Sequence, residues 1–187
     1  MKRKIILIFI ICLFMIGICA LGVKETQKKP ISKNNKNLVE TSENQLPFNA
    51  YKSFSGRRDI NEFISNNPID ADFNKNELPQ STAEIVKFYG EYIDYWEAEM
   101  DNALLILKNG LGNDGLKCLN SAQSNWSEYL KYDISTSNEI HIETAGIGSE
   151  MSILNSYKVL SKVRDRALEM IEYCILFEGN YEFVFKW

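Results

Sequence analysis

Apolar residues recur at the three- and four-residue spacing of an amphipathic helix in three long stretches of the chain. The first stretch follows Ser81-x-x-Glu84, a pattern in which the serine caps a helix and the glutamate completes a capping box. This helix is expected to run to about Lys108, because Asn109-Gly110 is a typical helix end. Its predicted inner face comprises Ile85, Tyr89, Tyr92, Trp96, Met100, Ala103 and Leu107.

The second stretch, Leu116–Asp133, begins after Gly112, and its apolar period weakens beyond Asp133. It places Trp126 on its inner face, and we expect the neighbouring helices to cover this large side chain. The third stretch begins at about Ser149, after a turn at 145–148. The other inner residues are Leu116, Leu119, Gln123 and Leu130 in the second helix, and Ile153, Tyr157, Leu160, Ala167, Ile171 and Cys174 in the third.

Shorter segments flank these helices. Residues 57–66 predict a short helix that ends at Asn66-Asn67-Pro68, because a residue before proline avoids the helical region. Three apolar residues near it are expected to pack as an extended arm, and residues 177–187 as a small strand or an irregular aromatic tail. The predicted fold is therefore all-α, an antiparallel bundle of three long helices with a short N-terminal helix or arm. The arm residues are Phe54, Ile69 and Phe73.

The N-terminus has the pattern of a secretory signal peptide, with Lys2-Arg3-Lys4 before an apolar run from Ile5 to Ala20. We expect residues 1–22 to be removed after Gly22, a small residue at a suitable position. An uncleaved anchor is one alternative, because the run is nearly long enough to span a bilayer. A lipid on Cys19 is another, although a bulky isoleucine precedes it.

Residues 23–56 are rich in lysine, asparagine, serine and threonine, and predict a flexible linker. The helical domain is then residues 57–187. We expect this domain to be extracytoplasmic, either secreted or attached to the outer face of the cell membrane. Contact with the membrane is expected only through the N-terminal segment.

Charge narrows the range of partners. With 21 basic and 25 acidic residues and an isoelectric point of about 5.2, the chain lacks the basic surplus that nucleic acid requires. A cationic protein fits better. Four carboxylates lie opposite the apolar face of the first long helix, and they form either a solvated face or a partner surface. They are Glu91, Asp94, Glu97 and Asp101.

Cys118 and Cys174 remain after removal of the leader. They lie at similar sequence distances on either side of the turn near Ala145, so we expect them at the same height on adjacent helices. In an oxidising compartment this position predicts a disulfide between them. The alternative is two buried free thiols.

Arg164 is the unusual residue of the third helix, because it falls in the middle of the apolar stripe. A buried guanidinium needs an acidic or carbonyl partner, and Asp133, Glu99 and Gln123 lie at the inner edges of their helices. We expect Arg164 to form an internal polar clamp that fixes the helix register. Binding of a ligand by this arginine is the alternative.

Little in the sequence indicates catalysis. His141 is the only histidine, and no nucleophile or set of metal ligands is placed around it. The chain has no glycine-rich phosphate loop and no CxxC motif. We therefore expect no enzyme, no cofactor and no metal, and we assign His141 to a possible partner surface on the Asn138–Ser149 connection.

Three motifs together resemble the LprI-like domain family, also known as the lysozyme inhibitor LprI-type N-terminal domain. Leu119-x-x-Ala122-Gln123-x-x-Trp126 is similar to its L-x-x-A-Q-x-x-W signature. Trp96-x-x-Glu99-Met100-Asp101-Asn102 resembles its W-x-x-E-L-N helix, and Arg164-Asp165-Arg166-Ala167-Leu168 its closing R-x-R-A-x-x-L element. Asn67-Pro68-Ile69-Asp70 resembles the start of some members, and the likeness spans about residues 66–176.

The resemblance implies a small secreted or membrane-tethered helical domain, and some members of the family are credited with inhibiting lysozyme. Tyr132-Asp133 stands where many members have a cysteine, so the usual family disulfide is not expected. We therefore expect a binding module that blocks a cationic muramidase sterically. An envelope scaffold with another protein partner is the alternative. The motif residues expected to serve as core and clamp are Gln123, Trp126, Asp133, Arg164 and Arg166.

Overall fold

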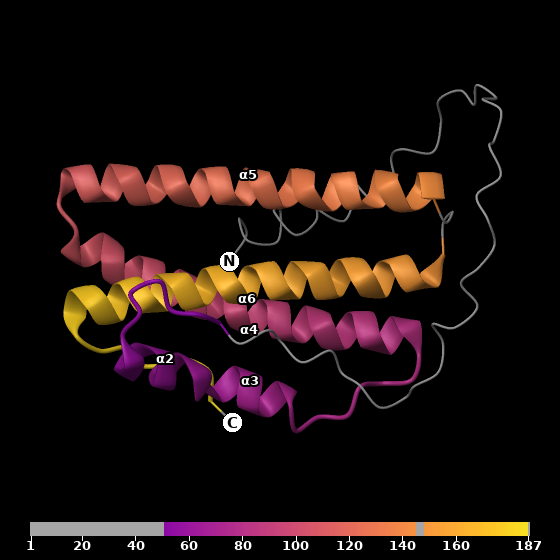
Figure 1. Cartoon of the computed structure of the whole chain (residues 1–187), viewed down its shortest axis with the longest axis horizontal. Coiled ribbons are helices and arrows are strands. Elements are labelled where there is room, and N and C mark those ends of the chain that lie inside the picture. Colours follow the sequence, from indigo (N-terminus) through magenta and orange to yellow (C-terminus); the bar gives the residue numbers. More distant parts are fainter. Residues whose placement is uncertain (1–50, 145–147, 187) are drawn as a thin grey trace, which may run out of the picture. The chain divides into compact units, whose positions relative to one another are not determined.

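The computed structural model describes residues 51–144 and 148–186, which belong to one compact unit of the chain. Within these ranges the chain forms helices and no strand (Figure 1). The all-α prediction with three long helices is confirmed. The predicted signal peptide and the first part of the predicted linker lie outside the described residues. The helices are α2 (Arg58–Ser65), α3 (Pro68–Phe73), α4 (Thr82–Gly110), α5 (Asn113–Thr144) and α6 (Ser149–Glu178).

Helix α4 begins at the predicted capping box. The Ser81 hydroxyl accepts a hydrogen bond from the Glu84 amide at 3.3 Å and donates one to the Glu84 carboxylate at 2.6 Å. The first bond pairs one of the backbone amides that every helix start leaves unpaired, and the second holds the Glu84 side chain in place. At the other end of the bundle, α6 stops at Gly179, whose φ of 84° is the left-handed conformation that glycine adopts most readily.

Helices α4 and α6 form the centre of the fold and run parallel to each other. The Tyr89 and Tyr157 rings are 5.6 Å apart, and further along both helices the Cys174 thiol donates a hydrogen bond to the Ala103 carbonyl. The predicted inner face of α4 is buried along its whole length. On α6 the buried face includes Leu160, Ala167, Ile171 and Cys174, while Ile153 and Tyr157 are half-buried.

Helix α5 lies on the side of the α4–α6 pair that is remote from α2 and α3 (Figure 1). It packs antiparallel to α6, but Leu119 is its only buried residue. We expected Trp126 to need a covering surface from both neighbours, yet it is only half-buried. The tryptophan at the centre of the core is Trp96 on α4, which is fully buried.

Helix α5 also continues to Thr144, well beyond the end of its apolar period. Polar contacts support this extension: the Asn155 side chain donates a 2.5 Å hydrogen bond to Asn138, and Thr136 donates one to the Tyr132 carbonyl. The predicted Asn138–Ser149 connection is therefore mostly helical, and residues 145–147 within it lie outside the described residues.

Two segments before α4 differ from the predictions. Ile69 and Phe73 are buried as expected, but α3 is a helix and not an extended arm, because Asn67 caps it and Pro68 occupies its first turn. The side chains of Tyr51 and Ser53 reach Glu172 on α6. The last part of the predicted linker is therefore docked on the helical domain.

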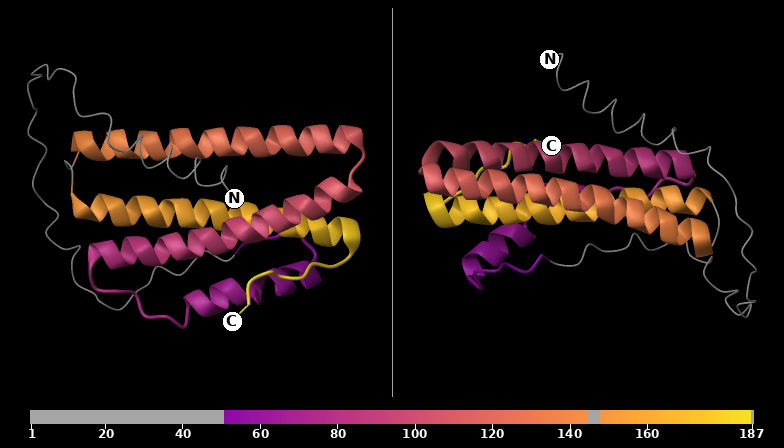
Figure 2. Two further views of the ribbon diagram at one scale, coloured as in Figure 1. Left: turned by 180° about the vertical axis from the view of Figure 1, so that it is seen from behind. Right: turned by 90° about the horizontal axis from the view of Figure 1, so that it is seen from above.

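The chain after α6 passes between α4 and α2 (Figure 2). Residues 179–186 are irregular, so of the two predicted forms the structure has the aromatic tail. Tyr181 is buried, the Phe183 ring stacks on Phe63 of α2 at 5.5 Å, and the Phe185 ring contacts Tyr95 of α4 at 4.9 Å.

Candidate functional site

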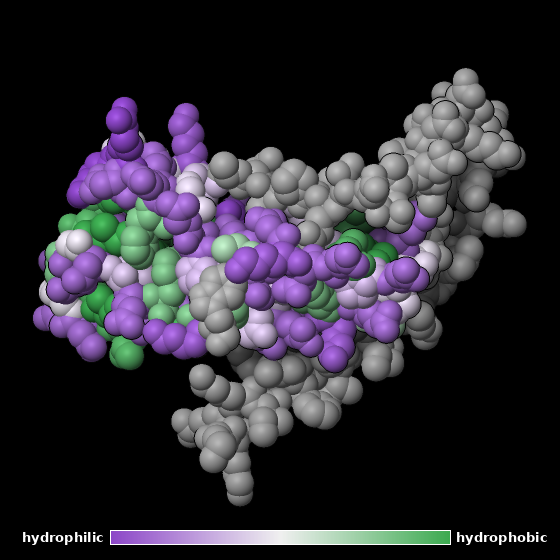
Figure 3. All heavy atoms as spheres, turned by 90° about the horizontal axis from the view of Figure 1, so that it is seen from below, coloured by the Kyte–Doolittle hydropathy of each residue, from purple (hydrophilic) through white to green (hydrophobic). Residues whose placement is uncertain are grey.

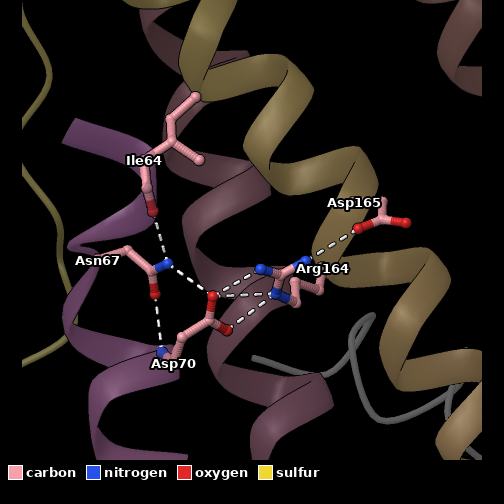
Figure 4. Close-up of polar contacts among 5 residues, drawn as sticks. All are labelled: Ile64, Asn67, Asp70, Arg164 and Asp165. Atoms are coloured by element: carbon pink, nitrogen blue, oxygen red, sulfur yellow. Dashed lines mark hydrogen bonds and ion pairs between the residues drawn. The ribbon is translucent and has the colours of Figure 1, made fainter. Parts of the chain in front are cut away.

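Arg164 is buried as predicted, and its partner is Asp70 of α3 (Figure 4). The guanidinium donates to the Asp70 carboxylate from Nη2 at 2.6 Å and from Nε at 2.8 Å, and from Nη1 to Asp165 at 3.0 Å. Asn67 fixes the aspartate in turn, since its amide donates to the Asp70 carboxylate at 2.7 Å. With both oxygens of Asp70 occupied, this arginine acts as an internal clamp.

The three partners that the sequence suggested for Arg164 lie elsewhere. Asp133 pairs with Lys158, Glu99 binds the tail, and Gln123 accepts from Arg166. The prediction was wrong because Arg164 projects from α6 toward α3 and α4, with its guanidinium 5.9 Å from the Trp96 ring.

A second clamp holds the chain before α2. The buried carboxylate of Glu172 accepts hydrogen bonds from the Ser53 hydroxyl at 2.5 Å, the Ser55 amide at 3.0 Å and the Tyr51 hydroxyl at 3.1 Å. Burial alone would raise the pKa of Glu172, but these hydrogen bonds stabilise the charged form, and the pKa lies below its ordinary value.

A third clamp holds the tail. The buried Glu99 carboxylate accepts 2.7 Å hydrogen bonds from the Tyr181 hydroxyl and from the Phe185 amide. Burial is the larger cause and the hydrogen bond to Glu99 the smaller cause of the raised pKa of the Tyr181 phenol. Each buried charge on α4 or α6 therefore fixes one segment outside the long helices, and its hydrogen bonds indicate a structural role.

Polar contacts line the other side of α6, where α5 packs. The Arg166 Nε donates to the Gln123 side chain at 3.1 Å, and the guanidinium lies 5.9 Å from the Trp126 ring. Further along, Lys158 forms a 3.0 Å ion pair with Asp133. Four of the predicted core-and-clamp residues therefore meet in this polar ladder, whereas Arg164 lies on the opposite side of α6.

A small hollow of about 170 Å³ opens at the far end of this ladder. It brings His141 next to the Asp133–Lys158 pair, with hydroxyl groups and one isoleucine completing the wall. Within the described ranges no three histidine, cysteine or acidic side chains are grouped closely enough to hold a metal ion. The lining residues are Asp133, Thr136, Ser137, Ile140, His141 and Lys158.

The acidic side chains of α4 form a row on one exposed side of the helix. Glu91, Asp94, Glu97 and Asp101 are all exposed on the side of α4 that faces away from the core. Lys87 approaches only the first of them, at 3.6 Å. Desolvation, and then the neighbouring charges of Asp94 and Asp101, raise the pKa of Glu97, as expected for carboxylates held close together on a rigid helix.

The predicted disulfide is not formed. Cys118 and Cys174 are both free thiols, the first exposed on α5 and the second buried on α6. The two residues lie on adjacent helices, but the Cys174 thiol points to α4, where it donates to the Ala103 carbonyl at 3.3 Å. Burial raises the pKa of Cys174 to about 12, so this thiol is unreactive in the folded protein.

Comparisons with protein-family models, with curated proteins and with solved structures each found no match. The likeness to the LprI-like family therefore stays a prediction that depends on the three sequence motifs. Among the helices of the described residues, none is long and apolar enough to cross a membrane.

Proposed function

We propose that this protein is an extracytoplasmic binding module that blocks a cationic muramidase sterically. The observation that supports the proposal is the acidic row on α4, which comprises Glu91, Asp94, Glu97 and Asp101. At 1.5 Å per residue the row extends over about 15 Å. Such a row attracts a basic protein over a distance and orients it before contact.

The rigidity of α4 favours this use of the row. The opposite face of the helix is buried along its length, and Trp96 is completely enclosed between α4 and α6. The carboxylates are therefore held in place before a partner arrives, which lowers the entropy lost on binding. In this proposal the Asn138–Ser149 connection, with His141 on the last turn of α5, is the element that enters a cleft.

A cell-wall lysis assay tests the proposal. Protein purified from cells that express the full chain should slow lysis by lysozyme when present in micromolar excess. A variant with Glu91→Gln, Asp94→Asn, Glu97→Gln and Asp101→Asn should lose most of this inhibition, because the charge that steers the encounter is removed. Added salt should weaken the wild-type effect.

The matched control neutralises the same number of exposed carboxylates away from the α4 row and from the Asn138–Ser149 connection, in a variant with Glu62→Gln, Glu77→Gln, Asp114→Asn and Glu128→Gln. Its net charge equals that of the α4 variant, so inhibition that survives in it assigns the effect to the α4 row. The absence of inhibition by the wild-type protein at micromolar excess would contradict the inhibitor proposal.

An envelope scaffold is the second candidate, and a separate surface favours it. Apolar side chains gather toward one end of the face shown in Figure 3. Near the end of α6, Phe54 and Tyr173 have ring centroids 5.1 Å apart, and both are exposed together with Leu176 and Phe177. Apolar contacts of this kind are typical of stable protein interfaces. Loss of envelope association in Phe54→Ser or Phe177→Ser, with lysozyme inhibition absent in the wild type, would favour the scaffold.

A further inference from the structure

The C-terminal tail has the alternation of a β-strand without a neighbouring strand. Tyr181, Phe183 and Phe185 face the domain, where they contact the Glu99 region, Phe63 and Tyr95 respectively. The residues between them point outward: Glu182, Val184 and Lys186 are exposed, and the valine side chain is 45% exposed. A period of two in burial is the pattern of an extended chain with one covered face.

The backbone of the tail has one occupied edge. The Phe185 amide donates to the Glu99 carboxylate at 2.7 Å. In an extended chain, successive residues direct their amide and carbonyl groups to opposite edges, so those of Glu182, Val184 and Lys186 point away from Glu99. Within the described part of the chain, no backbone–backbone hydrogen bond involves these three residues.

The outward-facing residues of the tail are also open to solvent. A hollow of about 630 Å³ lies next to the tail, and its wall includes Asn102 and Ile106 of α4 together with Glu182, Val184 and Lys186. An unpaired, extended and partly apolar edge is a template for the addition of another strand.

We propose that the partner at this edge is the tail of a second copy of the same chain, paired antiparallel with Val184 at the two-fold axis. In this register Glu182 of each copy lies opposite Lys186 of the other. Phe183 of each copy lies opposite Phe185 of the other, on the face that is directed toward the domains. Opposite charges and paired aromatic rings are the cross-strand contacts that stabilise an antiparallel ribbon.

The charged side chains of Glu182 and Lys186 are free to pair between copies in place of their contact within one chain. Within one chain the Lys186 ammonium lies 3.3 Å from the Glu182 carboxylate, and the two side chains are 73% and 90% exposed. Pairing of two copies replaces the two solvated contacts, one in each chain, with two contacts between the copies. A two-stranded ribbon is marginally stable by itself, so the dimer is expected to dissociate on dilution.

Disulfide trapping tests the register directly. In a background with Cys12→Ser, Cys19→Ser and Cys118→Ser, the substitution Val184→Cys places two thiols at the two-fold axis. Residues directly opposite in a hydrogen-bonded antiparallel pair have Cα atoms about 5.5 Å apart, within the range of a disulfide. Mild oxidation of the purified protein should therefore give a covalent dimer.

Glu182→Cys in the same background is the matched control. Its two copies would lie about 13 Å apart, which is four residues of an extended chain, and should form few disulfides. Equal trapping at both positions, or trapping at neither, would overturn the proposed register.

Sedimentation velocity over a range of concentrations tests the dimer without a covalent bond. The wild-type dimer fraction should rise with concentration, and Val184→Pro should abolish it by removing the central amide, whereas Val184→Thr should retain it. Lys186→Glu should weaken the dimer, and adding Glu182→Lys to it should restore the dimer. A monomeric wild type at every concentration, or a dimer that Val184→Pro does not affect, would overturn the proposal.

Discussion

Helix α6 packs against its two neighbours in different ways. On the α4 side the contact is apolar and closed, and even the charged side chain of Arg164 is only 5% exposed. On the α5 side the contact is a polar ladder, in which Lys158 and Asp133 are 30% and 25% exposed. Both sides follow the same helical period, but water reaches only one of them.

This difference determines what each polar contact contributes. An ion pair enclosed in the core strongly resists loss of one partner, because the remaining charge is left buried. An ion pair that water reaches contributes about 0–1 kcal/mol, since solvent competes with both partners. We therefore expect the α4 side to provide the stability of the domain and the α5 side mainly to set the register of a loosely attached helix.

The two tryptophans provide the strongest test of this comparison. Trp96→Ala should lower the free energy of unfolding by about 3–5 kcal/mol, because it leaves a large cavity in the closed core. Trp126→Ala should cost about 1 kcal/mol, since the ring is half-buried and its neighbours can relax into the space. Urea unfolding followed by circular dichroism measures both. Equal losses would show that α5 is as firmly packed as α4.

Two aspartates provide a second test with matched chemistry. Asp70→Ala should lower the free energy of unfolding by about 3 kcal/mol, because it removes the carboxylate that accepts hydrogen bonds from Nε and Nη2 of the buried Arg164. Asp133→Ala removes the partner of Lys158 and should cost about 0–1 kcal/mol. A double variant with Asp70→Leu and Arg164→Met should recover much of the loss. If the double variant remains as unstable as Asp70→Ala, buried charge is not the reason for the loss.

The sequence predicts the elements of the closed side well. The capping box at Ser81 and the apolar period of α4 locate this helix correctly, because burial on one face imposes a period that survives in the residues. The same period in α5 indicates which face turns toward α6, but not how deeply that face is buried. How deeply the face of α5 is buried depends on whether a further element covers it. A periodic pattern within one helix cannot show whether that element is present.

The clamps were harder to predict. The position of Arg164 in an apolar stripe correctly indicates a buried charge, but its partner Asp70 belongs to a segment that carries too few residues to show a period. Glu172 and Tyr181 were not singled out, because their partners come from residues far away in sequence. Glu172 accepts from a hydroxyl and a backbone amide of residues 53–55, and Tyr181 donates to the Glu99 carboxylate. The one local indication of Asp70 was the motif Asn67-Pro68-Ile69-Asp70, and it was noted only for its resemblance to a family.

Acid provides the third test, because it acts on the clamp that holds residues 51–55. The hydrogen bonds to Glu172 outweigh its burial and keep its pKa below the ordinary value of a glutamate, about 4.3. The clamp therefore contributes fully above that pH, and its contribution is lost as the pH falls through the lowered pKa. Unfolding free energies measured between pH 7 and pH 3 should show this loss in the wild type.

Glu172→Gln should be less stable at pH 7 by about 1–3 kcal/mol and should lose less stability on acidification. Glu128→Gln, at an exposed site on α5, should match the wild type throughout. A wild-type acid dependence that persists unchanged in Glu172→Gln would assign it to another carboxylate.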